Sequence, residues 1–509
     1  MVRSLRELFC FSSGTPSPQE SSPNITRLRS IRSIRNATTK ARFPRSPRHS
    51  MQLTKTAPQS SPVTSSPTTI STCVSTLASE ADSHASKSSA TSHSPTSFSD
   101  ATPKLPTIPS EECSTPYFSI LQPDGTLKAP QISFGGYGAF GGRFAPESIM
   151  GFLSELTSFF EATVSDASFW SEFASHQRAE PTPLQMAGKL TDLAGGATIW
   201  LKREDQNEYG THKTRNIIGQ LLLARRMGRT EIVTECAAAK HGSFAAAMCA
   251  RLGLRCVVVM GADDAQAQPE DILEMKLLGA KIVTARTPSG MGTLRAAITE
   301  ALRYSVCNHE TAYYLMGSPV GPSPLPTITR TFQALLGEEV AAQMHEAAGC
   351  QPDAVVTAVG SGSSAVGLFQ PFIHLPAVRL VAVEAARAAT LTEGDMGVLQ
   401  GARTLMLQNP DGQILDSHSI SPDLNLSTVG PEVAHWKDSG RIEIQTATDA
   451  DALDGFKTLQ HHEGFLPGLD SSHAVGPAVD LARQLGPGKN LVLLVTGSDN
   501  ISTQRGLDA

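Results

Sequence analysis

The sequence lacks the features that mark several common protein classes. No apolar run approaches the roughly 20 residues that a helix needs to cross a bilayer, because CVVVMGA and LVLLVTG are only strand-length. The net charge is −6, and the part that we expect to fold has no sustained basic stripe. We therefore expect a soluble protein that binds neither membranes nor nucleic acid as its main partner.

Two further absences concern cysteines and glycines. The eight cysteines form neither a CxxC pair nor a zinc-like spacing, which indicates reduced thiols in an intracellular compartment. No GxGxxG motif follows the first expected strand, and this argues against a dinucleotide-binding oxidoreductase. What the chain does have is length, since 509 residues with 40% hydrophobic content permit two or three domains and a large core.

Residues 1–130 differ in composition from the rest of the chain. They are rich in Ser, Thr and Pro and poor in aromatic residues, so they cannot bury enough apolar surface to offset the entropy of ordering, and we expect a disordered extension. The first fifty residues are biased toward arginine, with only Glu7 and Glu20 as acids. This composition is similar to a plastid or mitochondrial transit peptide, and a flexible tail of a cytoplasmic protein is the alternative.

From Phe134 onward, strand-like and helix-like patterns alternate. The strand-like runs EIVTE, CVVVMG, KIVTA, AVVTAVG, VRLVAVE and LVLLVTG are separated by helical stretches such as residues 242–252 and 327–348. Alternation of this kind predicts an α/β fold in which parallel sheets are joined by crossover helices. Two such sheets fit the length, so we expect two three-layer α/β domains with parallel-rich sheets.

The segment at residues 201–220, LKREDQNEYGTHKTRNIIGQ, places Lys213 between an expected strand and an expected helix. A lysine at such a junction is usually a solvated surface charge. Its neighbours His212 and Thr214, however, can donate hydrogen bonds to an anion. LKRED, GTHKT and GQLLLARRMG resemble the tryptophan synthase β subunit family of fold-type II pyridoxal-phosphate (PLP) enzymes, and the resemblance continues in register from Phe134 almost to the C-terminus.

The resemblance implies a covalent role for Lys213 and a domain division. In this family a partly desolvated lysine forms a Schiff base with the aldehyde of PLP. Residues 131–178 and 212–330 would form an N-terminal α/β domain with a mobile closing subdomain. Residues 179–211 and 331–509 would form a C-terminal α/β domain that carries the phosphate loop.

The sequence VGSGSSAVG comes after the apolar run AVVTAV and precedes a helical pattern. Glycines let backbone N–H groups approach an anion, and the start of a helix adds free donors, although a plain strand-to-helix connection fits the same pattern. In the family this loop binds the PLP phosphate, usually as GGGSN, and Ser361 and Ser364 here replace a glycine and an asparagine. The cofactor-binding residues that we expect are Lys213, His212, Ser318, Gly360, Ser361, Gly362, Ser363, Ser364 and Thr496.

Thr496, in VTGSDN, aligns with the family's hydroxyl residue at the pyridine nitrogen. Unlike an aspartate, a neutral hydroxyl does not keep that nitrogen protonated, which favours elimination and replacement at Cβ over transamination. A strand-ending threonine in a turn is the alternative interpretation. The resemblance also implies a monovalent cation bound by backbone carbonyls near Gly360, Leu426 and Thr428.

The sequence TECAAAKHG contains the second expected catalytic residue, Glu235. A carboxylate before a helix more often caps the helix, but the matching glutamate of the family handles protons, a role that burial in an apolar pocket would favour. The residues after it bind the substrate carboxylate in the family. Here that set is Cys236, Ala237, Ala238, Ala239, Lys240 and His241, in which Cys236 replaces a threonine, Ala237 and Ala239 replace glycines, and Lys240 replaces a glutamine.

Two further departures concern closure of the site. The family pairs an arginine with an aspartate that also contacts the serine hydroxyl, and this chain has Ala267 and Asn425 at those positions. Loss of the arginine and the aspartate together leaves no uncompensated charge. The pair of changes therefore indicates that the site closes in a modified way. Because of these changes, the sequence alone does not identify the substrate.

The resemblance implies β-replacement of L-serine, most simply with indole to give L-tryptophan. It also implies a homodimer and a separate α subunit as possible partners. The alternatives are a divergent PLP enzyme that uses another nucleophile or a substituted amino acid, and a catalytically silent homologue, against which the retained Lys213 and Glu235 argue.

Overall fold

The computed structural model describes residues 136–498 and 500–508, without the side chains of residues 501 and 508. The expected disordered or targeting extension at residues 1–130 lies outside the described residues. Among the residues that are described, none of the helices combines the length and the apolar character that crossing a membrane requires. The prediction of an α/β fold with parallel-rich sheets is confirmed by three sheets, two of which are dominated by parallel strands.

The largest sheet has six strands, and all neighbouring pairs are parallel except the antiparallel pair at one edge. Its strands are, in spatial order, β13 (Glu443–Ala447), β10 (Arg379–Ala385), β9 (Ala354–Ala358), β14 (Asn490–Val495), β4 (Thr198–Arg203) and β3 (Leu184–Met186). Apolar clusters cover both of its faces. This explains why β9 and β14 are near-continuous apolar runs, as is typical of strands buried on both sides.

A second, four-stranded sheet is entirely parallel. Its order is β7 (Lys281–Ala285), β6 (Arg255–Gly261), β5 (Glu231–Cys236) and β8 (Ala312–Leu315). The core around it includes an aromatic group in which Phe332 contacts Phe160, Phe169, Trp170 and Phe173 at ring distances of 5.9–6.1 Å. The expected division into two domains with the stated boundaries stays a prediction.

A third, antiparallel sheet was not predicted. It joins β1 (Gly136–Tyr137) and β2 (Phe140–Gly141) to β12 (Ala402–Met406) and β11 (Asp395–Leu399). Two of these strands have only two residues, too few to show the alternation that identifies a strand in a sequence.

The helices agree with most of the expected patterns. The principal ones are α1 (Met150–Val164), α2 (Ala167–His176), α4 (Thr214–Arg226), α5 (Ala239–Leu252), α8 (Leu294–Cys307), α9 (Leu325–Gln333), α10 (Leu335–Ala348), α14 (Asp449–Glu463) and α16 (Val475–Leu485). The expected helix at residues 327–348 is therefore two helices. Ala334 between them keeps helical backbone angles, so the interruption is local.

The remaining helices are short. The α-helices are α3 (Gly188–Ala194), α6 (Ala262–Gln266), α7 (Pro269–Leu277), α11 (Ser363–Leu368), α12 (Thr390–Glu393), α13 (Pro431–Asp438), α15 (Leu469–Ser472) and α17 (Asn500–Asp508). The 3-10 helices are η2 (Glu147–Ile149), η3 (Glu204–Gln206), η4 (Glu208–Gly210), η5 (Gln370–Phe372), η6 (Ala386–Ala388) and η7 (Pro422–Leu424).

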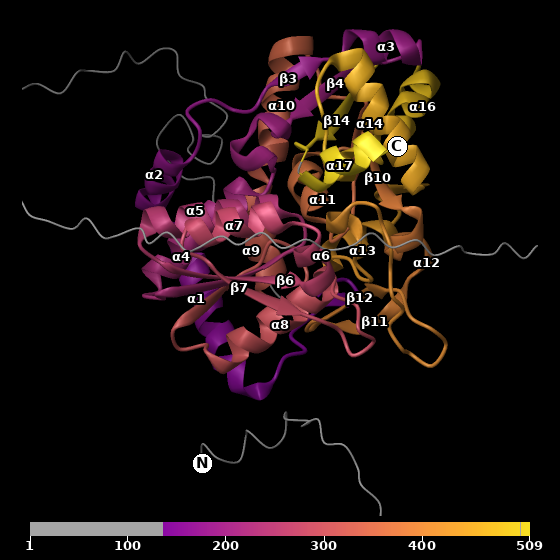
Figure 1. Cartoon of the computed structure of the whole chain (residues 1–509). Coiled ribbons are helices and arrows are strands. Elements are labelled where there is room, and N and C mark those ends of the chain that lie inside the picture. The colour runs from indigo at the N-terminus through magenta and orange to yellow at the C-terminus, as the bar shows by residue number, and fades with distance from the viewer. Residues whose placement is uncertain (1–135, 499, 509) are drawn as a thin grey trace, which may run out of the picture. The chain divides into compact units, whose positions relative to one another are not determined.

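The six-stranded sheet brings three distant segments together. Strand β14 pairs in parallel with both β4 and β9, so the carboxyl ends of all three strands lie at one edge of the sheet. In Figure 1, β4 and β14 lie next to each other although they are far apart in the sequence. The segments after these strands carry Lys213, the glycine-serine turn at residues 360–364, and Thr496. Ligands of parallel sheets bind at this edge.

Candidate functional site

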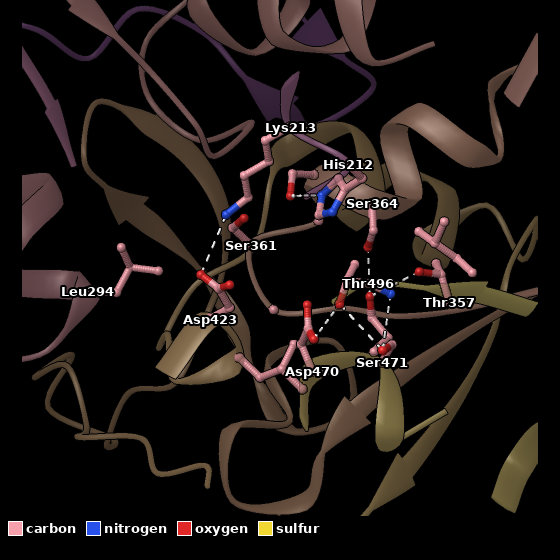
Figure 2. Close-up of a pocket in the computed structure, with 16 residues that line it drawn as sticks. His212, Lys213, Leu294, Thr357, Ser361, Ser364, Asp423, Asp470, Ser471 and Thr496 are labelled. Atoms are coloured by element: carbon pink, nitrogen blue, oxygen red, sulfur yellow. Dashed lines mark hydrogen bonds and ion pairs between the residues drawn. The ribbon is translucent and has the colours of Figure 1, made fainter. Parts of the chain in front are cut away.

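A cleft of about 470 Å³, counted with its open mouth, lies where these three segments meet. Lys213, His212, Thr496 and the whole turn at residues 360–364 line it. Figure 2 shows these side chains directed into one space. The structure therefore collects every expected cofactor-binding residue except Ser318 in a single cleft.

Lys213 is the residue immediately before helix α4, and its side chain is 11% exposed. Its ammonium nitrogen Nζ lies 3.5 Å from Oδ1 of Asp423, which belongs to η7 and also lines the cleft. The backbone N–H of Lys213 donates to the hydroxyl of Thr211 at 3.2 Å. The amine is thus shielded, held at its base, and directed into the cleft rather than into bulk solvent.

The turn at residues 360–364 is packed too closely for side chains at its glycines. A Cβ atom on Gly360 would lie 2.5 Å from the carbonyl oxygen of Asp423, and Gly362 has a φ of +99° that side chains strongly disfavour. The hydroxyl of Ser364 donates to the carbonyl of Ala358 at 2.7 Å. Because the first N–H groups of a helix have no partner within it, the start of α11 adds donors to those of the serine hydroxyls.

His212 connects this turn to Lys213. Its Nε2 lies 3.0 Å from the hydroxyl of Ser363, and its Nδ1 has no hydrogen-bond partner among the described residues. Burial, and then the positive charge of Lys213, lower the pKa of His212 to about 3. The imidazole is therefore neutral at physiological pH, and it offers a buried polar atom without a partner beside the cleft.

Thr496 is paired with a carboxylate that the sequence analysis did not single out. Its hydroxyl donates to Oδ1 of Asp470 at 2.6 Å. Burial alone would raise the pKa of Asp470, but the charge of Lys240 and the hydrogen bond from Thr496 hold it below its usual value. Lys240 in turn donates to the carbonyl of Gly497 at 2.6 Å, so its charge lies beside the Thr496 end of the cleft.

Glu235 stands at the end of β5 and is fully enclosed. Its Oε1 accepts the backbone N–H groups of Gly317 at 2.9 Å and Ser318 at 3.0 Å, and its carboxyl also interacts with the side chain of Tyr314. Burial raises the pKa of its carboxyl above the usual value. Ser318 donates its backbone N–H to Glu235, and neither residue lines the cleft. The expected binding of the cofactor by Ser318 stays a prediction.

The expected substrate-binding segment at residues 236–241 also lies outside the cleft lining. Gln268 fixes it, because its Oε1 accepts the N–H of Ala239 at 2.9 Å and its Nε2 donates to the carbonyl of Ala237 at 2.7 Å. The Sγ of Cys236 contacts the carbonyl of Ala238 at 3.1 Å, and His241 contacts Thr234 at 2.8 Å. The backbone N–H of Ala239, expected to bind the carboxylate of the substrate, thus already donates to Gln268.

Asn425 and the residues of the expected cation site have partners within the fold. The side-chain oxygen of Asn425 accepts a hydrogen bond from Ser417 at 2.8 Å, and Asn425 does not line the cleft. The carbonyl of Leu426 accepts from Thr390 at 3.3 Å, and the hydroxyl of Thr428 donates to Leu405 at 3.1 Å. The described residues contain no group of three or more His, Cys, Asp or Glu side chains that could hold a metal ion. A cation bound by carbonyls stays a prediction.

Several residues that line the cleft were not expected from the sequence. They are Leu294, Thr357, Ala358, Asp423, Leu424, Asp470, Ser471 and Leu494. Asp423 stands two residues before Asn425, and Asp470 precedes a Ser-Ser-His sequence. An acid next to a residue already assigned to the site was the available signal for Asp423.

Comparisons with known proteins agree with this geometry. A sequence model of the family described as "Pyridoxal-phosphate dependent enzyme" matches residues 176–497, which is more than half of the chain. A curated relative from Saccharomyces cerevisiae, named "Tryptophan synthase", is 43% identical over 379 residues, or 72% of this chain and 53% of the relative. The chain thus spans about half the length of that relative.

Proposed function

This chain belongs to the family of pyridoxal-phosphate-dependent enzymes, and we propose that it replaces the hydroxyl group of L-serine with indole to give L-tryptophan. The name of the yeast relative supports these substrates. The observation that carries the proposal is the meeting, in one cleft, of Lys213 with the turn at residues 360–364 and Thr496.

The residues of the cleft fit pyridoxal phosphate. When bound, this cofactor supplies an aldehyde that joins amines covalently and a ring that accepts electrons from a neighbouring carbon. The turn at residues 360–364 would hold its phosphate with neutral donors, and Thr496 would contact its ring nitrogen. Lys213 is the amine that lines the same cleft. The unpartnered Nδ1 of His212 is a further polar atom that a bound group could satisfy.

Two side chains would move protons in the reaction. Lys213, when its amine is free, can accept a proton at Nζ from the α-carbon of the amino acid. Glu235 can carry a proton on Oε2, because Oε1 already accepts two N–H groups and burial favours the neutral acid. Glu235 does not line the cleft, and it is by resemblance to the family that its proton would pass to the departing hydroxyl of serine, which leaves as water. Burial of both groups would exclude solvent from the reaction.

Two partners belong to the same proposal. By resemblance to the family, we infer that the chain forms a homodimer and that a separate α subunit could supply indole. Sedimentation of the purified chain should give twice the monomer mass. A stable monomer with full turnover would contradict the dimer. The cell compartment, organelle or cytoplasm, depends on residues outside the described part.

A different nucleophile or amino acid is a second candidate. Lys240 places a positive charge beside Gly497, and Gln268 occupies the N–H of Ala239. Both features change the region where the family binds the substrate carboxylate. Turnover of another pair of substrates, with none of serine and indole, would favour this candidate.

The test is reconstitution of the purified chain with pyridoxal phosphate, followed by addition of L-serine and indole. We expect mass spectrometry to detect L-tryptophan, and only when both substrates are present. Bound cofactor without any tryptophan would contradict the proposed reaction and leave the family membership in place.

A further inference from the structure

Asp423 is the acidic side chain that contacts Lys213, and the proposed reaction does not use it. Its Oδ1 lies 3.5 Å from Nζ of Lys213, and its side chain is 18% exposed. Figure 2 shows this carboxylate and Leu294 on the side of the lysine opposite to Ser364 and Thr357. Ser361 of the turn at residues 360–364 lies beside Lys213 and Asp423 in the same view, so the carboxylate lies next to the reacting amine at the edge of the turn.

The position of Asp423 is fixed by its backbone. Its carbonyl oxygen lies against Gly360, so closely that a Cβ there would approach to 2.5 Å. Asn425, two residues further, is directed toward Ser417 and away from the cleft. Among residues 422–425, Asp423 is thus the member that presents a charge to Lys213.

A second acid, Asp264, lies near Asp423 but adds no second negative charge. Asp264 of α6 is 9% exposed, and its Oδ2 has no hydrogen-bond partner among the described residues. Burial, and then the charge of Asp423, raise the pKa of Asp264 to about 8. Asp264 therefore carries a proton at neutral pH. The other acid that lines the cleft, Asp470, is paired with Thr496 at the far end. Glu235 also interacts with Lys213, but burial raises the pKa of its carboxyl, and Asp423 is the acid within ion-pair distance of the amine.

We propose that Asp423 is a specificity-determining residue whose carboxylate selects amino acids with an uncharged, hydrogen-bond-donating β-substituent and rejects those with an anionic one. The proposal rests on the function proposed above. The hydroxyl of L-serine can donate to the carboxylate. The phosphate of O-phospho-L-serine would place like charges together in a partly buried cleft, which is strongly unfavourable.

The test compares two ligands on the cofactor-loaded protein. L-Serine and O-phospho-L-serine are titrated into the wild type, Asp423→Asn, Asp423→Glu and the exposed control Asp438→Asn, and binding is followed by the absorption of the bound cofactor. We expect the wild type to prefer serine, Asp423→Asn to lose at least about tenfold of that preference, which corresponds to about 1.4 kcal/mol, and Asp423→Glu and Asp438→Asn to keep it.

A second measurement requires no amino acid. The absorption of the bound cofactor is recorded against pH in the wild type and in Asp423→Asn. Because a carboxylate stabilises a protonated nitrogen next to it, removal of the charge should move the midpoint to lower pH. An unchanged midpoint would overturn the contact between Asp423 and the reacting nitrogen.

The outcomes separate this inference from the proposed function. A wild type that binds both ligands equally overturns the role of Asp423, whether or not tryptophan forms, and this result needs no variant to fold. Equal preference in the wild type and in Asp423→Asn overturns it as well. A wild type that prefers serine through Asp423 but makes no tryptophan with indole contradicts the proposed reaction alone.

Discussion

Lys202 and Lys213 belong to one continuous segment, yet their surroundings in the folded protein are opposite. Nζ of Lys202 is fully buried and has three oxygen partners, the carbonyl of Thr182 at 2.8 Å, Glu339 at 2.8 Å and Gln343 at 3.0 Å. Lys213 lines a cleft and has one ion pair, to Asp423 at 3.5 Å. A lysine whose donors are all used holds the structure, whereas one with spare donors in a cleft can react.

The network around Lys202 also stabilises the start of helix α4. Arg215, which is buried, contacts Glu204 at 2.9 Å and Glu339 at 2.7 Å. Burial alone would raise the pKa of Glu204, but the charges of Arg215 and Lys202 hold it at about 2. The charged side chains around Lys202 are therefore paired with one another. The amine of Lys213, in contrast, faces the cleft, where it can bind another group.

The variant Lys213→Ala tests most strongly whether Lys213 reacts with the cofactor rather than stabilising the fold. We expect turnover of L-serine with indole to fall by at least about 10³-fold, because both the covalent bond to the cofactor and a proton carrier are lost. The urea unfolding midpoint should stay near that of the wild type, since Lys213 has one long ion pair. The exposed Lys189→Ala is the control. A Lys213→Ala protein that keeps turnover and the visible absorption of the cofactor would refute the assignment.

Glu235→Gln tests the proton carrier that belongs to the reactive side. Glutamine can still accept the two backbone N–H groups but has no acidic proton, so we expect kcat to fall by about 10²–10⁴-fold. In the wild type, activity should decline as pH rises through the raised pKa of Glu235, because the acid must hold its proton. This decline should be absent in the variant. The exposed Glu310→Gln should behave as the wild type, and equal loss there would contradict the role.

Lys202→Met should act on stability. Removing Lys202 leaves two buried carboxylates, Glu204 and Glu339, to share the charge of Arg215, so we expect the free energy of unfolding in urea to drop by about 3–5 kcal/mol. Adding Glu339→Gln should recover part of the loss. The exposed Lys489→Met should leave the urea midpoint unchanged. A Lys202→Met protein that is as stable as the wild type but inactive would contradict the structural role of Lys202 and would indicate a role in the reaction.

Gly360→Ala has the smallest expected effect. The added methyl group would meet the carbonyl of Asp423 at 2.5 Å, so the turn must shift, and we expect cofactor affinity to weaken by about tenfold, in line with overpacking elsewhere. Gly476→Ala, in helix α16 with nothing within 4 Å of the new atom, is the matched control. Cofactor titration of the apoprotein measures both. Equal affinity in the two variants would show that the turn tolerates a side chain.

The sequence predicted the cofactor side of the cleft well because each of its residues comes after a recognisable strand. Lys213, the turn at residues 360–364 and Thr496 come after β4, β9 and β14, and neighbouring parallel strands bring the segments at their carboxyl ends to one edge of the sheet. The local patterns gave the strands, and the resemblance to the family singled out these residues among the segments that follow them. The same patterns do not distinguish Lys202 from Lys213, because the distinction depends on Glu339 and Asp423, which come from distant segments.

The parts that were missed depend on contacts between distant residues. Asp423 and Asp470 lie outside the strands, and their roles appear only when the chain is folded. The antiparallel sheet pairs Gly141 with Arg403 through strands too short for a pattern. The hydrogen bond from the backbone N–H of Ser318 to Glu235 also depends on a distant contact, the position of β8 beside β5.

The most direct measurement is reduction of the cofactor-loaded protein with sodium borohydride, which fixes the cofactor to the lysine that holds it, and then peptide mapping. The lysines to be compared are Lys213, Lys202 of the same segment, and Lys240, which contacts the carbonyl of Gly497. The structure predicts that the added mass appears on Lys213 alone. Recovery of the mass on Lys240 or Lys202 would contradict the account of this cleft.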